Sequence, residues 1–154
     1  MRIYAVSDIH GYSRQLDVTL SMIDMSGDNK LVLLGDYIHG PDGYGVLDRI
    51  IGLQEKYGPD KVVALLGNHE EMALDGLWPI GAHRFGDDKK YQKKDKDEKY
   101  LLWMSKLPRY YVVKNTIFVH AGIDEYAASD GLWELGTCEH IFTCKYPAQT
   151  GRIE

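Results

Sequence analysis

Polar side chains that could bind a divalent metal ion follow four short apolar runs of this chain. The five best candidates are Asp8, His10, Asp36, Asn68 and His120. They offer carboxylate, imidazole and amide groups without a thiolate, a set that suits Mn, Fe or Zn in a hydrolytic site better than a structural zinc site. Two such ions about 3.5–4 Å apart, sharing one carboxylate, can polarise a phosphoryl group and activate a water molecule between them. The residues therefore point to a metal-assisted hydrolytic site.

Taken singly, each of these residues has a simpler explanation. Asp36 and Asn68 each follow a glycine, and a turn or helix-cap residue is the commoner role there. His10 and His120 could each be hydrogen-bonded structural histidines. We favour the metal site because four motifs, each at the end of a predicted strand, would otherwise need four separate explanations. In Asp8-Ile9-His10, alternate side chains of an extended segment also point the same way, so both can reach one ion.

The elements that must position these residues are short buried strands alternating with helices. Apolar runs of four or five residues predict strands at residues 3–6, 31–34 and 62–66. Helical spacing follows each run, marked in turn by Leu16, Leu20 and Ile23, by Val46, Leu47, Ile50 and Leu53, and by Met72 and Leu77. This alternation predicts an α/β fold with a largely parallel sheet built from βαβ crossovers. Ligand sites in such sheets lie beyond the carboxyl ends of the strands, where every polar motif of this chain falls.

The second half of the chain delivers His120 from a predicted hairpin. Its strands are expected at residues 110–113 and 116–119, with the turn at Lys114-Asn115. A helix is predicted over residues 100–107, ended by a proline. The mixed-sign run between Gly86 and Lys99 is expected to be a solvated helix or loop, with a lid over the site as the alternative.

Composition predicts one globular domain over residues 1–154, with 44% apolar and 11% aromatic residues. A net charge of −5 without a basic stripe argues against nonspecific nucleic-acid binding. A negative net charge is still compatible with a phosphorylated substrate, because bound cations supply local positive charge. The first residues run directly into a motif, no apolar run is long enough to span a membrane, and Cys138 and Cys144 form no CxxC pair. We therefore expect a cytoplasmic protein with reduced thiols and no membrane contact.

Four motifs resemble those of the calcineurin-like metallophosphoesterases. They are Ser7-Asp8-Ile9-His10-Gly11, Gly35-Asp36, Gly67-Asn68-His69-Glu70 and Val119-His120-Ala121-Gly122. They are similar to the family's DxHG, GD, GNHE and HAG motifs, in the same order and over essentially the whole chain. The best match is the bacterial branch of serine/threonine-protein-phosphatase-like enzymes, which includes diadenosine tetraphosphatases.

The resemblance implies a metallophosphoesterase-type sheet flanked by helices, beginning βαβαβ. It also implies hydrolysis of phosphate monoesters, in phosphoprotein or nucleotide substrates, by a metal-bound hydroxide at a binuclear site. Asp8 and His10 would hold the first divalent ion, Asp36 would bridge both, and Asn68 and His120 would hold the second. Mn is the first choice for these two ions, with Fe or Zn as alternatives.

The resemblance assigns His69 the task of protonating the leaving oxygen or stabilising the transition state. The second motif departs from the family's GDxxDRG pattern, because residues 35–41 read GDYIHGP. His39 stands where an Asp would orient His69, and the phosphate-binding Arg is missing. We consider His39 as a solvated loop residue, a proton-transfer group or a metal ligand. Arg84 is the candidate to replace the missing substrate-binding Arg.

The resemblance further implies a shortened C-terminal part. Family members continue into a Gly-His motif and strands that complete a second sheet, whereas here only His140 follows His120. We expect an incomplete second sheet, exposed strand edges that could support a homo-oligomer, and one protein ligand fewer at the second metal ion. The active phosphomonoesterase is the favoured hypothesis. The alternatives are a truncated, inactive metal-binding remnant or binding module, and a metal-dependent phosphodiesterase.

Overall fold

The structure, a computed structural model, describes residues 1–83 and 97–122. Arg84, His140, both cysteines and most of the mixed-sign run lie outside these residues. The order of elements in the described part is β1 (Ile3–Val6), α1 (Ser13–Ser21), β2 (Lys30–Leu33), α2 (Gly43–Tyr57), β3 (Val62–Ala64), α3 (Asn68–Leu74), α4 (Asp97–Met104), β4 (Tyr110–Val113) and β5 (Thr116–Val119).

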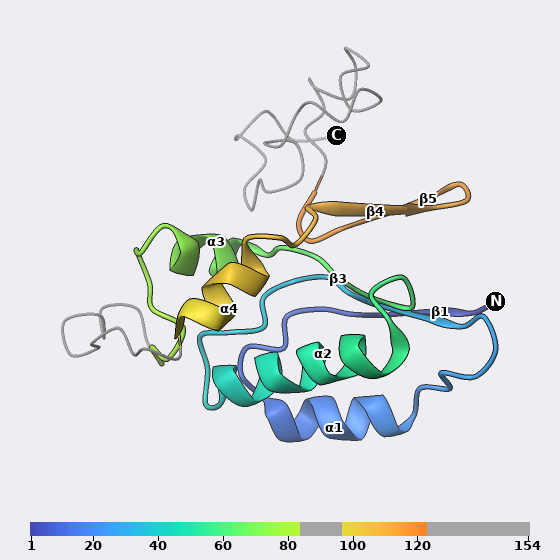
Figure 1. Cartoon of the computed structure of the whole chain (residues 1–154), viewed down its shortest axis with the longest axis horizontal. Helices are drawn as coiled ribbons and strands as arrows, with labels where there is room; N and C mark the ends of the chain where they lie inside the picture. Colours follow the sequence, from blue (N-terminus) through green and yellow to red (C-terminus); the bar gives the residue numbers. More distant parts are fainter. Residues whose placement is uncertain (84–96, 123–154) are drawn as a thin grey trace, which may run out of the picture.

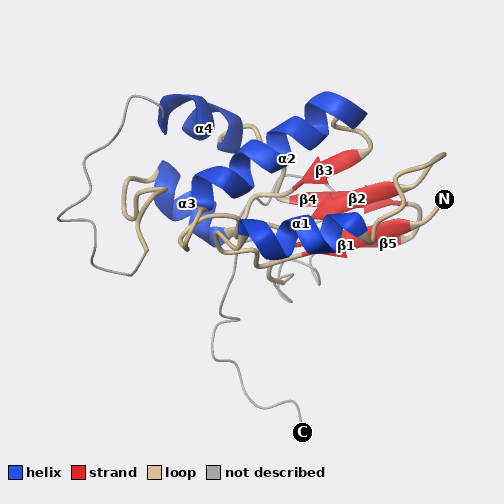
Figure 2. Ribbon diagram, turned by 90° about the horizontal axis from the view of Figure 1, so that it is seen from below, coloured by secondary structure: helices blue, strands red, loops and turns tan. Residues whose placement is uncertain are grey.

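A parallel sheet of order β1-β2-β3 forms the centre of the molecule, with Ala5 opposite Val32 and Val32 opposite Val63. The helices α1 and α2 make the two crossovers and lie side by side on one face of this sheet (Figure 1). The antiparallel hairpin β4–β5 lies on the opposite face. The view from below in Figure 2 shows the same layers, with α1 and α2 across the sheet. The predicted βαβ arrangement is confirmed.

Both faces of the parallel sheet are buried, which explains why its strands are apolar without alternation. Leu31 and Leu33 of β2 belong to the larger core cluster, together with the buried side chains of α1 and α2. Val32, on the other face of the same strand, belongs to a second cluster in which Tyr111 and Phe118 of the hairpin pack. Successive residues of one strand thus fill two cores.

The helices α1 and α2 are joined by a polar contact as well as by the core. The guanidinium of Arg49 in α2 donates two hydrogen bonds, of 2.7 and 2.8 Å, to the carboxylate of Asp17 in α1. The first turn of α2 is capped by Asp42, whose side chain accepts from the backbone N–H of Gly45 at 3.0 Å. Among the helices of the described residues, none is long and apolar enough to cross a bilayer.

The hairpin forms at the predicted residues, but two helices end earlier than predicted. The helix α3 ends at Leu74, so Leu77 lies outside it and is 68% exposed. The reason is Gly76, whose φ of +71° is left-handed and stops the helix. The helix α4 ends at Met104 instead of continuing to residue 107. Its first residue, Asp97, belongs to the run expected to be solvated but is buried, and it accepts a hydrogen bond from the Tyr44 hydroxyl at 2.5 Å.

Candidate metal centre

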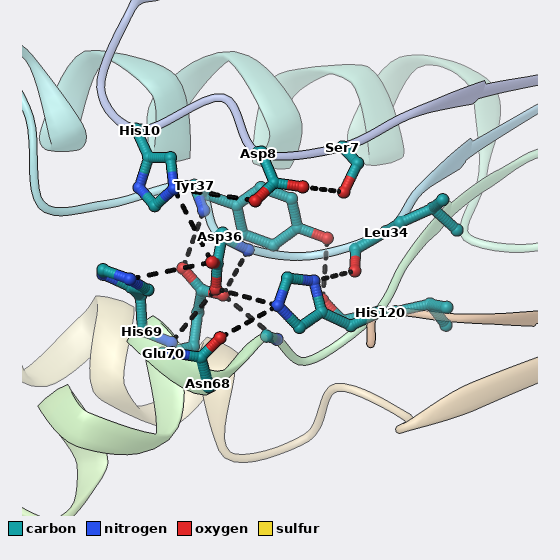
Figure 3. Close-up of polar contacts among 12 residues, drawn as sticks. Ser7, Asp8, His10, Leu34, Asp36, Tyr37, Asn68, His69, Glu70 and His120 are labelled. Carbon is teal, nitrogen blue, oxygen red and sulfur yellow. Dashed lines mark hydrogen bonds and ion pairs between the residues drawn. The ribbon is translucent and has the colours of Figure 1, made fainter. Parts of the chain in front are cut away.

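The five candidate metal ligands meet at the carboxyl ends of four strands (Figure 3). Asp8 and His10 lie in the loop after β1, and Asp36 lies in the loop after β2. Asn68 is the first residue of α3, in the connection after β3, and His120 directly follows β5. The structure therefore brings the parallel sheet and the hairpin together at one site.

Asp36 occupies the centre of this site (Figure 3). Its Oδ2 lies 3.6 Å from Nε2 of His10, and its Oδ1 lies 3.3 Å from Nε2 of His120. On the outer sides, Oδ1 of Asp8 lies 3.7 Å from Nε2 of His10, and Oδ1 of Asn68 lies 3.0 Å from Nε2 of His120. The site thus has one carboxylate between two pairs of side chains that could bind a metal ion.

Backbone carbonyl groups set the tautomers of His10 and His120. Nδ1 of His10 lies 3.3 Å from the carbonyl oxygen of Ile38, and Nδ1 of His120 lies 2.9 Å from that of Leu34. A carbonyl oxygen only accepts, so each Nδ1 carries the proton. In the neutral ring the lone pair is then on Nε2, which faces the carboxylate of Asp36. Histidines that ligate metal ions are held in this way by a partner on their other nitrogen.

The carboxylate of Asp36 is fully buried, and its Oδ2 has no hydrogen-bond partner among the described residues. Burial opposes ionisation, but the contacts with His120 and with the backbone N–H of His69 outweigh it and hold the pKa of Asp36 below its usual value. For His120, burial opposes the charged form, but Asp36 outweighs burial and raises its pKa. A buried anionic oxygen that faces imidazole nitrogens without a hydrogen-bond donor fits a divalent cation.

His69, to which the resemblance gives a catalytic role, also lies at this cluster. Its Nε2 is 3.7 Å from Oδ2 of Asp36. Donor atoms of His10, Asp36 and His69 all lie within 4.8 Å of one another. His69 thus belongs to the group of donor side chains around Asp36.

The loop after β1 is joined to the loop after β2 by backbone hydrogen bonds, with His10 N–H donating to the carbonyl of Asp36 at 2.9 Å.

Backbone strain is concentrated at the site in these two loops. Positive φ angles occur at Asp8 (54°), His10 (44°), Asp36 (59°) and His39 (63°). Among the described residues, Lys114 in the hairpin turn is the other non-glycine residue with a positive φ. Such strain persists only where surrounding contacts hold it, and it gathers at functional sites.

Gly67 allows the loop after β3 to approach the loop after β2. A Cβ at this position would collide with the backbone N of Asp36. The glycine of the predicted GNHE motif is therefore required for the close approach of two backbones. It brings Asn68 and His69 up to Asp36, whose Oδ1 accepts from the His69 backbone N–H at 3.1 Å.

Glu70 was given no chemical role by the sequence reasoning, but it holds the site together. Its fully buried carboxylate accepts hydrogen bonds from the backbone N–H groups of Asp36 and Tyr37 at 2.8 Å, Gly67 at 3.1 Å and Ile38 at 3.3 Å. Burial and the nearby charge of Asp36 raise the pKa of Glu70 to about 7, against the effect of these donors. A Glu at the third position of a helix after Gly67 was the available signal, because this position reaches back to the preceding loop.

His39 is not the solvated loop residue considered above, because it is only 6% exposed. Its Nδ1 lies 2.8 Å from Nδ1 of His69, and its Nε2 lies 2.9 Å from the carbonyl oxygen of Trp78. Both nitrogens are engaged, so this conformation leaves neither for a metal ion. The indole of Trp78 stacks on His39 with ring centroids 3.9 Å apart.

Residues 1–145 match the family model described as calcineurin-like phosphoesterase, and the chain belongs to that family. The α/β fold with a parallel sheet flanked by helices, predicted for this family, is thereby confirmed. A Caenorhabditis elegans protein that carries the name of a serine/threonine-protein phosphatase is 31% identical to this chain over 77 residues, which are 49% of this chain and 21% of that relative.

Several solved structures share the fold at low sequence identity. A cold-active protein tyrosine phosphatase has a TM-score of 0.63 at 22% identity, over 84% of this chain and 43% of its own. A protein serine/threonine phosphatase from Saccharomyces cerevisiae has a TM-score of 0.61 at 21% identity, over 79% of this chain and 38% of its own. A metallophosphoesterase from Sphaerobacter thermophilus has a TM-score of 0.53 at 23% identity, over 79% and 47%. This chain thus spans less than half of each of these proteins.

Proposed function

We propose that this chain hydrolyses phosphate monoesters at a site that binds two divalent metal ions, with manganese as the first choice. The observation that carries the proposal is the position of Asp36. Its buried carboxylate lies between two pairs of metal-binding side chains, and the histidine of each pair directs Nε2 toward it. Membership of the calcineurin-like phosphoesterase family supports the same chemistry.

Each proposed ligand has a definite place around Asp36. Asp8 and His10 would hold one ion, and Asn68 and His120 would hold the other, with Asp36 as a ligand shared between the two pairs. Bound ions would supply positive charge for the phosphoryl oxygens and lower the pKa of water. The protein would supply fixed donor positions in a buried setting, which keeps this charge effective.

His69 is the proposed proton donor for the leaving group. Hydrolysis of a phosphate monoester forms a bond between phosphorus and the oxygen of water and breaks the bond to the alcohol oxygen, which leaves with a proton. Nε2 of His69 faces the site beside Asp36, and in the doubly protonated form of the ring it can deliver that proton. After the alcohol leaves, the same nitrogen can regain a proton from solvent.

The proposed substrates are phosphorylated protein side chains or nucleotide monoesters. The phosphatase names of the relatives support a phosphorylated substrate. Arg84 remains our candidate to replace the substrate-binding Arg that the second motif lacks. A single domain over residues 1–154 and a cytoplasmic location also remain predictions.

The proposal is tested by metal content together with turnover of an aryl phosphate in added manganese. We expect about two equivalents of metal and measurable turnover in the wild type. Asp36→Asn should lower kcat/KM by more than about 100-fold, which is the upper range for the outer-shell partners of metal ligands. Asp60→Asn, at an exposed loop residue, is the matched control and should leave both readouts unchanged.

Turnover that survives chelation and is equal in wild type and Asp36→Asn would contradict this function. A bis(aryl) phosphate measured in parallel separates monoester from diester hydrolysis, and a faster reaction with the diester would favour the phosphodiesterase alternative. Metal binding without turnover of either compound would favour the inactive remnant.

A further inference from the structure

His69 has a second contact, on the nitrogen that faces away from Asp36. Its Nδ1 lies 2.8 Å from Nδ1 of His39, inside the protein. The other nitrogen of His39, Nε2, lies 2.9 Å from the carbonyl oxygen of Trp78. The Trp78 indole stacks on the His39 ring at an interplanar angle of 17°, which fixes the plane of that ring. A chain of two hydrogen bonds therefore runs from a backbone carbonyl to His69.

The positions of the protons in this chain follow from the nature of its ends. The carbonyl oxygen of Trp78 only accepts, so Nε2 of His39 carries a proton and donates it. Burial lowers the pKa of His39 to about 4, so its ring is neutral and Nδ1 has a lone pair. Nδ1 of His69 must then carry a proton and donate to His39, because two lone pairs cannot form a hydrogen bond.

We propose that His39 is a positioning residue that fixes the Nδ1–H tautomer of His69 and directs Nε2 of His69 toward Asp36. The carbonyl of Trp78 determines the direction of both hydrogen bonds, and the stacked indole holds His39 in place. Nε2 of His69, on the side of Asp36, is then the nitrogen that takes up and gives up the catalytic proton. The catalytic consequence rests on the proposed phosphoesterase function, whereas the tautomer does not.

A neutral ring with an acceptor on one side and a donor on the other suits this position better than a carboxylate. A carboxylate at position 39 would direct a negative oxygen at His69 but would have no proton for the carbonyl of Trp78. It would also bring a further buried carboxylate close to those of Asp36 and Glu70, which are both fully buried. The imidazole meets both partners without adding charge.

The side chain of Asn offers a test of this assignment. Its Oδ1 stands where the imidazole has Nδ1, so His39→Asn keeps an acceptor for His69. Asn also tolerates the left-handed backbone at this position, where φ is 63°. His39→Leu is close to Asn in size but offers no acceptor. The two variants therefore differ in the hydrogen bond to His69 while sharing the loss of the imidazole.

The first measurement is nuclear magnetic resonance of the metal-free protein labelled with nitrogen-15 in its histidines. The ring nitrogen shifts of His69, assigned by their absence in His69→Gln, report which nitrogen carries the proton. At a pH where the ring is neutral, we expect the proton on Nδ1 in the wild type and in His39→Asn, and a tautomer mixture in His39→Leu. A proton on Nε2 of His69 in the wild type would overturn the proposal, as would an unchanged spectrum in His39→Leu.

The second measurement is steady-state turnover of the aryl phosphate, with metal content determined for each variant. His39→Leu should lower kcat about 10- to 100-fold with little change in KM and unchanged metal content, because part of the contribution of general acid catalysis is lost. His39→Asn should restore kcat to within about threefold of the wild type. Exposed His83 supplies the matched controls, and His83→Leu and His83→Asn should match the wild type.

Equal losses of kcat in His39→Asn and His39→Leu would show that His39 has only a packing role. If the wild type shows no turnover with any phosphate ester, the proposed function fails, and the nitrogen-15 spectra still decide the tautomer. If His39→Leu does not fold, the wild type and His39→Asn spectra suffice.

Discussion

Three histidines of the site have one ring nitrogen held by a backbone carbonyl, and the choice of nitrogen decides what each can do. In His10 and His120 the held atom is Nδ1, so Nε2 faces the carboxylate of Asp36 as a metal ligand would. In His39 the held atom is Nε2, so Nδ1 faces another histidine instead. The nitrogen that the carbonyl holds thus decides whether a histidine faces Asp36 or faces another histidine.

Burial of His39 in its neutral form predicts a pH-dependent stability of the metal-free protein. The pKa of His39 falls from 6.5 to about 4 on folding, mainly because burial disfavours the charged ring. Its folded pKa is depressed, so the stability gained by the neutral ring is present above pH 6.5 and is lost as the pH falls toward 4. Relative to His39→Asn, the wild type should lose up to about 3 kcal/mol of unfolding free energy over this range.

Denaturant unfolding of the two proteins at several pH values measures this difference. Glu70, whose pKa is raised, titrates in both proteins and therefore cancels in the comparison. Equal pH dependence of wild type and His39→Asn would contradict a neutral, buried His39.

At this scale the sequence was sufficient to predict that the candidate metal ligands lie together, but it did not reveal which groups hold them in place. Asp8, Asp36 and Asn68 stand in short motifs directly after apolar runs. Each residue and the motif around it can therefore be recognised in the sequence. The partner of His39 is a backbone carbonyl 39 residues away, and any residue type at that position has a carbonyl. Side-chain identity therefore could not reveal the contact with Trp78.

The loops after β2 and β3 are held together by side-chain hydrogen bonds that the apolar pattern of the strands does not reveal. Glu70 in the first turn of α3 accepts four backbone hydrogen bonds, three of them from the loop after β2 and one from Gly67. The elements were predictable from apolar periodicity because both faces of the sheet are covered. The ends of α3 and α4 were not, because Gly76 and the turn after Met104 stop these helices against the apolar pattern.

Removal of the Glu70 carboxylate should destabilise the metal-free protein strongly. Glu70→Ala leaves four backbone N–H groups without their acceptor, and each buried unsatisfied donor costs about 1–3 kcal/mol. We expect the free energy of unfolding to fall by roughly 3 kcal/mol or more, as measured by denaturant titration. Glu71→Ala is the matched control, because this neighbour pairs with Arg109 at a partly exposed site and such a pair contributes about 1 kcal/mol or less. Similar losses in the two variants would show that Glu70 does not hold the loops.

The described part of the molecule contains two β-sheets, and the candidate site lies where they meet. The parallel sheet supplies Asp8, His10, Asp36 and Asn68, while the hairpin on its opposite face supplies His120. Tyr111 and Phe118 of the hairpin make apolar contacts with the sheet, and the ring of His120, which contacts Leu34 and Asn68, links the hairpin to the site. A cation bound by residues of both would therefore stabilise the contact between the hairpin and the parallel sheet.

Metal binding should consequently raise the stability of the whole molecule and of the hairpin in particular. A ligand at 100 times its Kd adds about 2.7 kcal/mol to the free energy of unfolding, which for a chain of this size raises Tm by roughly 5–10 °C. We expect this rise when manganese is added to the metal-free wild type, with slower amide hydrogen exchange in β5. In Asp36→Asn both effects should vanish, because the variant lacks the carboxylate that joins the two donor pairs. A rise in Tm without slower exchange in β5 would mean that metal binds only to the loops of the parallel sheet, and that His120 is not a ligand.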